Sequence, residues 1–180
     1  MERLDPASTV LFIVDVQERL AAAMPDDTLE RLVKNATILL ETAKTLGMKV
    51  LTSEQYPKGL GPTLPSLPLP NAPMPKMTFD AVSDLAIARA LSATQARAVV
   101  LVGMETHVCV FQTARELVKR GYATYVVADA VTSRREENRL VGLSLCEKAG
   151  AVVTGTESVA FDLLEVAGTD AFKAVSKLVR

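Results

Sequence analysis

The sequence contains a single histidine, His107, and only two cysteines, Cys109 and Cys146. Two cysteines in a chain of 180 residues do not make a disulfide framework, so we expect reduced thiols and a cytoplasmic location. One histidine in the whole chain cannot build the nitrogen-rich sites that zinc prefers. No phosphate-binding P-loop or GxGxxG motif follows a strand-like run. We therefore expect neither a metal nor an organic cofactor.

Blocks of like charge and long apolar runs are also absent. Twenty Lys and Arg residues stand against 21 Asp and Glu residues, a formal net charge of −1. Nucleic-acid-binding surfaces usually carry a basic stripe, so we expect no nucleic-acid partner. The apolar runs fall far short of the roughly 20 residues that cross a bilayer, and the polar start MERLDPAS lacks a signal region. We expect no membrane association.

The chain does contain enough apolar residues for one substantial core. They make up 49% of the 180 residues, and charged residues make up 23%, as in ordinary globular proteins. No internal repeat or low-complexity tail divides the sequence. We predict a single domain over residues 1–180.

Apolar strand-like runs alternate with longer helical patterns. We predict strands over 9–15, 48–53, 96–103, 122–129 and 151–155, and helices over 29–47, 81–91, 106–120 and 135–149. The strands are uninterrupted apolar runs, which is typical of strands covered on both faces. Strands separated by helices of this length predict a parallel sheet between two helical layers.

The segment 57–75, PKGLGPTLPSLPLPNAPMP, breaks this alternation. It holds seven of the nine prolines and two of the nine glycines, so we expect no regular element to run through it. A flexible linker between domains is one interpretation, but the residues before it lack enough core to fold alone. We favour an ordered surface loop that delivers the residues around Lys76 to a defined place.

Several polar or reactive residues follow the predicted strands directly. In open parallel α/β sheets, ligands bind beyond the carboxyl ends of the strands, where the strand order reverses. These positions hold Asp15, the residues 54–56, the region of Lys76 and the stretch 103–109. We expect the functional site to be formed there.

Cys109 is the candidate nucleophile. It falls in the first turn of a predicted helix, where unpaired amides and the helix dipole favour a thiolate, and a nearby lysine would favour it further. Asp15 is placed to take up the thiol proton. Two other interpretations remain open: Cys109 is a small buried apolar side chain, or His107 is its base in a Cys–His dyad. Otherwise His107 lines the pocket or a subunit contact, and Cys146 is a buried helix residue.

Three blocks of the sequence resemble the isochorismatase-like hydrolase superfamily. The blocks are LFIVDVQERL near the start, a lysine followed by MTF in the middle, and GMETHVCVFQTARELVKRGYATYVVADAVTSR. They are ordered and spaced as in the superfamily over about residues 8–160. The stretch SEQYPKGLGPT is similar to the small isochorismatase domain-containing proteins in particular.

The resemblance implies a Rossmann-like three-layer α/β/α sandwich with a six-stranded parallel sheet of order 3-2-1-4-5-6. It also implies an Asp-Lys-Cys triad, which maps onto Asp15, Lys76 and Cys109. A cis peptide bond at Met104–Glu105 is implied as well. The backbone amides of Glu105 and Cys109 would then form an oxyanion hole.

The sequence departs from the metal-containing members of this superfamily. Nicotinamidases carry an Asp-x-His pair and further histidines after the second strand, where this chain reads SEQYPKG. This argues against nicotinamidase activity and against a structural zinc. Here we expect Gln55 and Tyr56, beside Glu54, to shape a substrate pocket with Gln17 opposite them.

The leading functional hypothesis is a metal-independent cysteine hydrolase that cleaves an amide-like C–N bond of a small molecule through a thioester. A thiol redox sensor is one alternative, although it would need a resolving cysteine. A regulatory or scaffold protein that keeps the fold without turnover is another. Apolar stripes on the last helical segment and on the helix after Cys109 indicate a homo-oligomer, a dimer or a tetramer.

Overall fold

The structure is a computed structural model that describes residues 3–179. Its centre is a six-stranded sheet in the order β3-β2-β1-β4-β5-β6, and every neighbouring pair of strands is parallel. The strands are β1 (Thr9–Val14), β2 (Lys49–Gln55), β3 (Met74–Lys76), β4 (Ala98–Met104), β5 (Ala123–Thr132) and β6 (Val152–Thr154). The predicted sheet and its strand order are confirmed.

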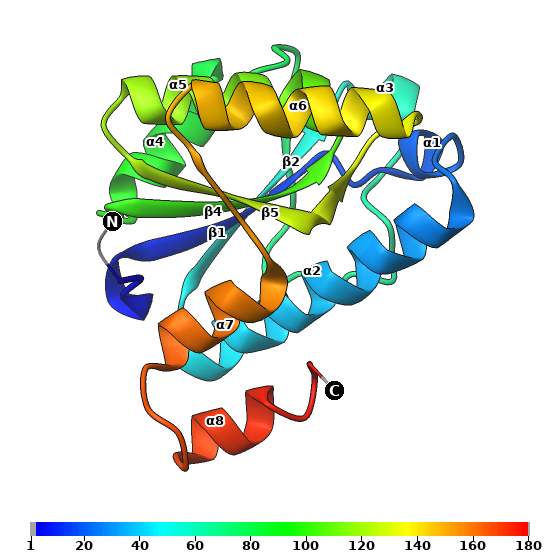
Figure 1. Cartoon of the computed structure of the whole chain (residues 1–180). Coiled ribbons are helices and arrows are strands. Elements are labelled where there is room, and N and C mark those ends of the chain that lie inside the picture. The colour runs from blue at the N-terminus through cyan, green and yellow to red at the C-terminus, as the bar shows by residue number, and fades with distance from the viewer. Residues whose placement is uncertain (1–2, 180) are drawn as a thin grey trace.

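Helices cover both faces of this sheet (Figure 1). One face is covered by α4 (Leu85–Ala93), α5 (Phe111–Lys119) and α6 (Glu136–Lys148), and the other by α2 (Asp26–Leu46) and α7 (Thr156–Leu164). The last helix, α8 (Asp170–Val175), packs against α2 and α7. The short elements are η1 (Pro6–Ser8), α1 (Glu18–Ala21), α3 (Pro57–Leu60), η2 (Ala81–Ser83) and the π-helical turn η3 (Thr106–Val110). The three-layer α/β/α architecture is confirmed.

The two faces of the sheet are packed by two separate apolar clusters. Leu11 and Ile13 belong to the cluster under α2 and α7, whereas Val10, Phe12 and Val14 belong to the cluster under α4, α5 and α6. Successive side chains of a strand point to opposite faces of the sheet. An uninterrupted apolar strand therefore contributes side chains to both clusters. Every residue of β1 and of β4 is buried, as the apolar runs predicted.

Helix boundaries differ from the predictions at both ends; the predicted helix 81–91, for example, is the turn η2 followed by α4, which ends at Ala93. The first long helix begins at Asp26 rather than Leu29, because Asp26 and Asp27 are favourable in a first turn beside the positive end of the helix dipole. It ends at Gly47, whose φ of 68° is left-handed. The predicted helix 106–120 is divided into the π turn η3 and the α-helix α5.

The proline-rich segment is an ordered excursion, as predicted, but regular structure occurs at both of its ends. The prediction that no regular element runs through it was wrong there: α3 is a single turn that starts with Pro57, and β3 ends at Lys76. Proline is compatible with the first turn of a helix and with an edge strand, and β3 is the edge strand beside β2. Lys76 is thereby fixed at the edge of the sheet.

The central strands approach each other closely where β1 ends. Gly103 pairs with Val14 in the parallel register, and a Cβ at Gly103 would lie 2.0 Å from the Val14 carbonyl oxygen. With a φ of 130°, only glycine fits this position. The residues that follow these two strands, Asp15 and the turn η3, are therefore held side by side.

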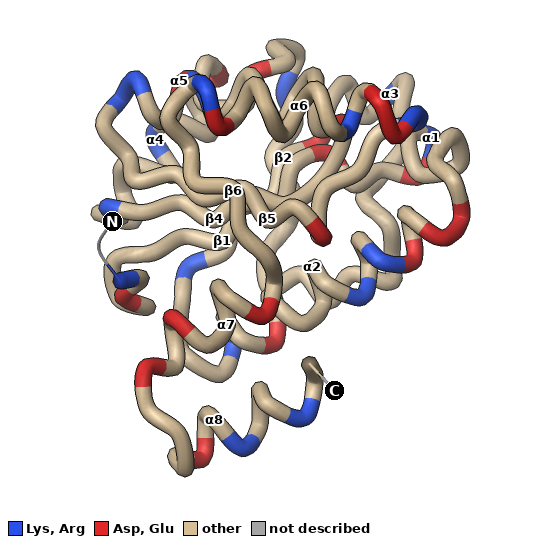
Figure 2. Tube along the Cα trace, viewed as in Figure 1, with Lys and Arg blue, Asp and Glu red and all other residues tan. Residues whose placement is uncertain are grey.

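Charged residues of both signs are distributed over the helices (Figure 2). Acidic and basic residues both occur along α2 and in α8. Within residues 3–179, no helix is long and apolar enough to cross a membrane.

Candidate active site

Asp15 lies immediately after β1 and is completely buried. Its backbone adopts a left-handed conformation with a φ of 52°, which is uncommon for a residue other than glycine. Its Oδ1 accepts a hydrogen bond of 2.7 Å from the Ser53 hydroxyl, and its Oδ2 lies 2.7 Å from the Lys76 Nζ. The carboxylate is therefore fixed from two sides.

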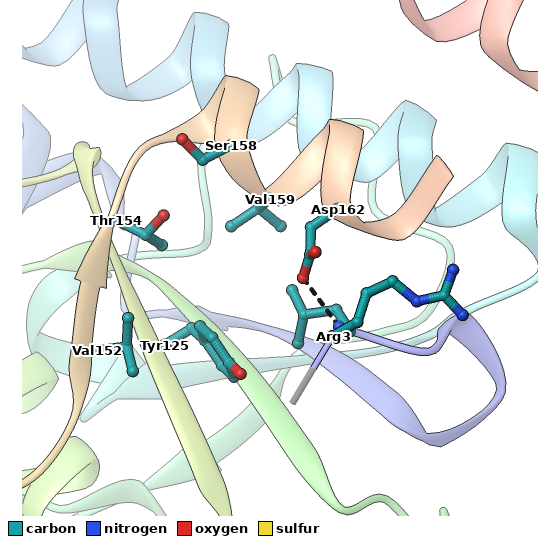
Figure 3. A pocket seen from close by; sticks show the side chains of 8 residues that line it. Arg3, Tyr125, Val152, Thr154, Ser158, Val159 and Asp162 are labelled. Atoms are coloured by element: carbon teal, nitrogen blue, oxygen red, sulfur yellow. Dashed lines mark hydrogen bonds between the residues drawn. The ribbon is translucent and has the colours of Figure 1, made fainter. Parts of the chain in front are cut away.

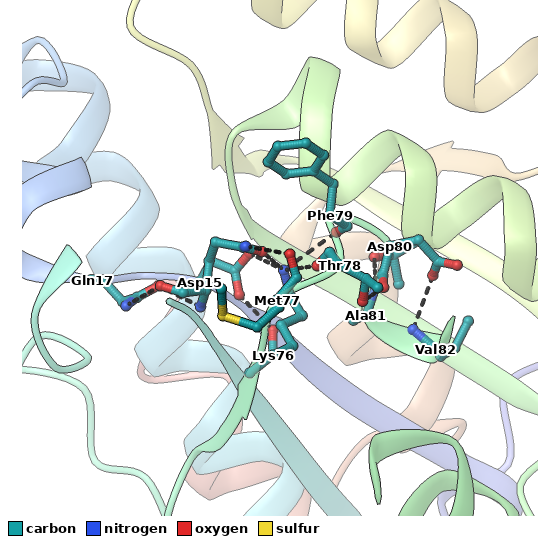
Figure 4. Close-up of polar contacts among 12 residues, drawn as sticks. Asp15, Gln17, Lys76, Met77, Thr78, Phe79, Asp80, Ala81 and Val82 are labelled. Atoms are coloured by element: carbon teal, nitrogen blue, oxygen red, sulfur yellow. Dashed lines mark hydrogen bonds and ion pairs between the residues drawn. The ribbon is translucent and has the colours of Figure 1, made fainter. Parts of the chain in front are cut away.

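Lys76, at the end of β3, is the cationic partner of Asp15 (Figure 4). Both side chains are fully shielded from solvent. The Lys76 Nζ also donates to the Gln55 Oε1 at 2.5 Å and to the carbonyl oxygens of Thr78 and Phe79 at 3.1 and 3.3 Å. A buried ammonium is tolerated because oxygen atoms surround it.

Cys109 lies in the π turn η3, after β4, and is 5% exposed. The charges of the Asp15 carboxylate and the Lys76 ammonium both act on its thiol: Asp15 raises the pKa of the thiol, and Lys76 lowers it. The structure thus brings together the three residues that the resemblance implied. π turns in helices occur frequently at functional sites.

The pKa of Cys109 shifts in the direction opposite to the sequence-based expectation. Burial, followed by the charge of Asp15, raises the pKa of the Cys109 thiol to about 12, and the opposing effect of Lys76 is smaller. This direction is opposite to the one that the helix dipole and a nearby lysine predict for a thiol in the first turn of a helix. The helix-dipole argument failed because it left out desolvation and the neighbouring carboxylate.

Glu105 begins the turn that carries Cys109. The peptide bond Met104–Glu105 is cis, in agreement with what the resemblance implied. The Glu105 carboxylate is held by Arg134, whose backbone amide and Nε lie 3.0 and 3.2 Å from its Oε2. The Glu105 carbonyl accepts from the amides of Val108 and Val110, so the chain turns tightly around Cys109. The side chain of Glu105 is occupied by these structural contacts.

His107 faces Ser133. Its Nδ1 lies 3.1 Å from the Ser133 Oγ, which also accepts a hydrogen bond from the Thr106 amide. The groups that act on the Cys109 thiol are Asp15 and Lys76. This arrangement favours Asp15 over His107 as the base for Cys109.

The three residues expected around the substrate have different environments. Gln17 is completely buried, and its amide bonds to the Gln55 backbone and the Gly61 carbonyl. Gln55 is also buried and donates from Nε2 to the Met77 carbonyl. Tyr56 is 48% exposed, and its ring lies against Gly59. Glu54 accepts hydrogen bonds from the amide and hydroxyl of Thr63, which hold the start of the proline-rich loop.

Ser53 is the site residue that the sequence patterns missed. We singled out the residues after the second strand, whereas Ser53 lies within that strand and pairs with Val14 in the sheet. The register pairs Ser53 with Val14, the last residue of β1, and so places Ser53 next to Asp15.

The second cysteine lies elsewhere. Cys146, in α6, is completely buried, and burial raises the pKa of its thiol to about 12.

Among residues 3–179, no group of three or more His, Cys, Asp and Glu side chains is arranged to hold a metal ion.

A separate cavity lies between the sheet and α7 (Figure 3). It measures about 340 Å³, and its lining includes Tyr125, Thr154 and Asp162. None of the candidate catalytic residues lines this cavity.

Comparison with known proteins identifies the family of this chain. The family model for the isochorismatase domain matches residues 9–158. Isochorismatase domain-containing protein 2 of Bos taurus is 38% identical over 180 residues, which span 99% of this chain and 86% of that protein.

Solved structures share the fold over nearly the whole chain. MAR1 ribonuclease from Caenorhabditis elegans superposes with a TM-score of 0.90 at 34% identity, over 99% of this chain and 92% of that one. The ycaC gene product of Escherichia coli, an octameric hydrolase of unknown specificity, superposes with a TM-score of 0.88 at 23% identity, over 98% and 90% of the two chains. From the matched domain and the bovine relative together, the chain belongs to the isochorismatase domain family.

Proposed function

We propose that this protein is a metal-independent cysteine hydrolase that cleaves an amide-like C–N bond of a small molecule. The observation that carries the proposal is the buried Asp15–Lys76 ion pair, whose two charges both affect the buried Cys109 thiol. A nucleophile, a base and a cation at one sheet edge are what acyl transfer through a thiol requires. Primary amides, ureido groups and related carbamoyl compounds have the matching chemistry.

The first step adds the neutral Cys109 thiol to the substrate carbonyl and gives a tetrahedral intermediate; the thioester forms when the C–N bond breaks in the second step. As the Cys109 sulfur attacks the carbonyl carbon, its proton passes to the Asp15 Oδ2. Lys76 stabilises the negative charge that develops on sulfur as the proton leaves it. The carbonyl oxygen becomes an oxyanion, which the backbone amides of Glu105 and Cys109 are placed to bind.

The second step releases the amine and then the acid. The tetrahedral intermediate collapses, the C–N bond breaks, and Asp15 returns the proton to the departing nitrogen. Asp15 then accepts a proton from a water molecule, which attacks the thioester carbon. The C–S bond breaks, the proton passes to sulfur, and Cys109 is again a neutral thiol.

For substrate binding we propose Gln55 and Tyr56, with a supporting role for Gln17. Tyr56 is exposed beside the proline-rich loop and offers a ring and a hydroxyl to a ligand. Gln17 holds the backbone of Gln55 through two hydrogen bonds and so fixes this side of the pocket. A small, weakly polar, uncharged substrate suits these groups.

The direct test is ammonia release from a panel of small amides, ureides and carbamoyl compounds. We expect Cys109→Ala to reduce the best rate by at least about a thousandfold, because the covalent route is lost. Cys146→Ala, which removes the other thiol, is the matched control and should retain the rate. Turnover that survives Cys109→Ala would exclude this mechanism.

RNA is included in the panel because the similar Caenorhabditis elegans structure is described as a ribonuclease. The balanced charge of this chain, 20 basic and 21 acidic residues, gives little attraction for phosphates. Cleavage of RNA that depends on Cys109 would contradict the amide-like substrate and indicate a phosphodiester substrate instead. No turnover of any panel member would favour a regulatory protein instead.

We also propose that the protein is a homo-oligomer. Tyr56, Met77 and Phe79 are large apolar side chains exposed at 48%, 69% and 55% around the carboxyl edge of β2 and β3. Leu140 and Val141 are exposed on α6, the helix next to η3. Light scattering that gives the mass of one chain would contradict this proposal.

A further inference from the structure

The Ser53 hydroxyl lies against the Asp15 carboxylate inside the protein. Ser53 is completely buried in β2, and its Oγ donates to the Asp15 Oδ1 at 2.7 Å. The Ser53 carbonyl accepts from the Asp15 amide at 3.1 Å. A single residue therefore holds both the backbone and the side chain of Asp15.

The two oxygens of Asp15 have different partners. Oδ1 is occupied by the Ser53 hydroxyl. Oδ2 is paired by charge with Lys76 at 2.7 Å, yet it is buried and accepts no hydrogen bond from any residue in the described part of the chain. An ionised carboxyl group is an acceptor at both oxygens, so Oδ2 keeps lone-pair capacity for a proton.

We propose that Ser53 is a positioning residue that assigns the two Asp15 oxygens different tasks. Oδ1 is held in place, and Oδ2 is left to exchange a proton with the Cys109 thiol. This inference rests on the proposed function, in which Asp15 is the base. A proton acceptor held in one orientation avoids the loss of rate that a freely rotating group would suffer.

A purely structural role for Ser53 makes a different prediction. If the hydroxyl only satisfied a buried oxygen, its loss would lower stability and leave the chemistry of the thiol unchanged. In the positioning role, its loss loosens the contact between Asp15 and the thiol. Burial and then the charge of Asp15 raise the pKa of Cys109, whereas Lys76 lowers it, so moving the Asp15 charge away from the thiol lowers the pKa of Cys109.

The test measures the rate at which iodoacetamide labels Cys109, followed by peptide mass, between pH 7 and 11. We expect Ser53→Ala to be labelled about three- to tenfold faster than the wild-type protein at pH 8, since one pKa unit changes the thiolate population tenfold. Asp15→Asn should be faster still. Ser53→Thr, which keeps the hydroxyl, should stay within about twofold of the wild type.

Thr9→Val is the matched control. Thr9 is buried in β1, and its hydroxyl has no partner in the described residues, so its removal deletes a buried hydroxyl without touching Asp15. Its labelling rate should equal that of the wild type. If Ser53→Ala folds poorly, Ser53→Cys keeps the volume with a weaker donor, and the peptide mass separates its added thiol.

Two results separate this inference from the proposed function. Wild-type labelling in Ser53→Ala, together with faster labelling in Asp15→Asn, overturns the role of Ser53 and leaves the triad standing. Unchanged labelling in Asp15→Asn overturns the triad itself. The inference is supported if Ser53→Ala is labelled faster than the wild type and Ser53→Thr is labelled at close to the wild-type rate.

Discussion

At the scale of single residues, the site depends on a buried ion pair. Asp15 and Lys76 are both shielded from solvent, and their charged atoms lie 2.7 Å apart. Removing two charges from water is costly, and the cost is offset only when each charge has close polar partners. Ser53 supplies one for Asp15, and Gln55 supplies one for Lys76.

Replacing Lys76 with methionine tests this dependence. We expect Lys76→Met to lower the free energy of unfolding by about 3–5 kcal/mol, because Asp15 is left as a buried, unpaired charge. Urea denaturation followed by circular dichroism measures the change. The double variant Asp15→Asn/Lys76→Met has neither charge and should regain most of the loss. An equal loss in the single and double variants would contradict this account.

At the scale of elements, the nucleophile turn is shaped by the helix packed on it. A Cβ at Gly142, in α6, would lie 2.6 Å from the His107 amide nitrogen and 2.7 Å from the Thr106 carbonyl carbon. Helix α6 therefore rests directly on the backbone of η3. The Ser133 hydroxyl, which accepts from the Thr106 amide, holds the same turn from the end of β5.

Gly142→Ala is expected to displace η3 and with it Cys109. Alanine gains about 1 kcal/mol over glycine in a helix, but an overpacked contact costs about 1–3 kcal/mol. We expect a net loss of stability of about 1 kcal/mol and at least a tenfold loss of ammonia release, because the nucleophile is misplaced. Ser144→Ala, at an exposed position of the same helix, is the control and should match the wild type. Full activity in Gly142→Ala would show that α6 does not position the nucleophile.

At the scale of the whole molecule, the two thiols link stability to pH. Cys109 and Cys146 lie in the same apolar cluster, on the face covered by α4, α5 and α6. Burial is the first cause that raises the pKa of each thiol from 9.0 to about 12. The folded protein therefore holds both protons more tightly than the unfolded chain does.

We expect stability to fall as pH rises from about 9 towards 12. The thiols stabilise the fold fully below the unfolded pKa, and this contribution is lost through the folded pKa, at about 1 kcal/mol per pH unit for each thiol. Urea midpoints at pH 8 and pH 10.5 measure the loss. Cys146→Ala lacks one thiol, so its loss should be smaller. Equal losses in the variant and the wild type would contradict the link for Cys146.

The sequence predicted the architecture well and the site only in part. The order of strands followed from the resemblance, and the burial of β1 and β4 followed from their uninterrupted apolar residues. The edge strand β3 escaped detection because three residues ending a proline-rich segment carry no periodic signal. Ser53 escaped because a serine in a strand has no distinctive pattern until the neighbouring strand is in place.

The sequence by itself determined the sheet between helical layers and the residues that follow its strands, because apolar runs and helical spacing are local properties of a chain. Only the tertiary structure decided that Lys76 pairs with Asp15 inside the protein, that Ser53 holds one oxygen of that carboxylate, and that burial and the charge of Asp15 raise the pKa of Cys109. The physical reason is that desolvation and charge act through space. The groups concerned come from four separate segments, and their summed effect on one sulfur exists only once the sheet has formed.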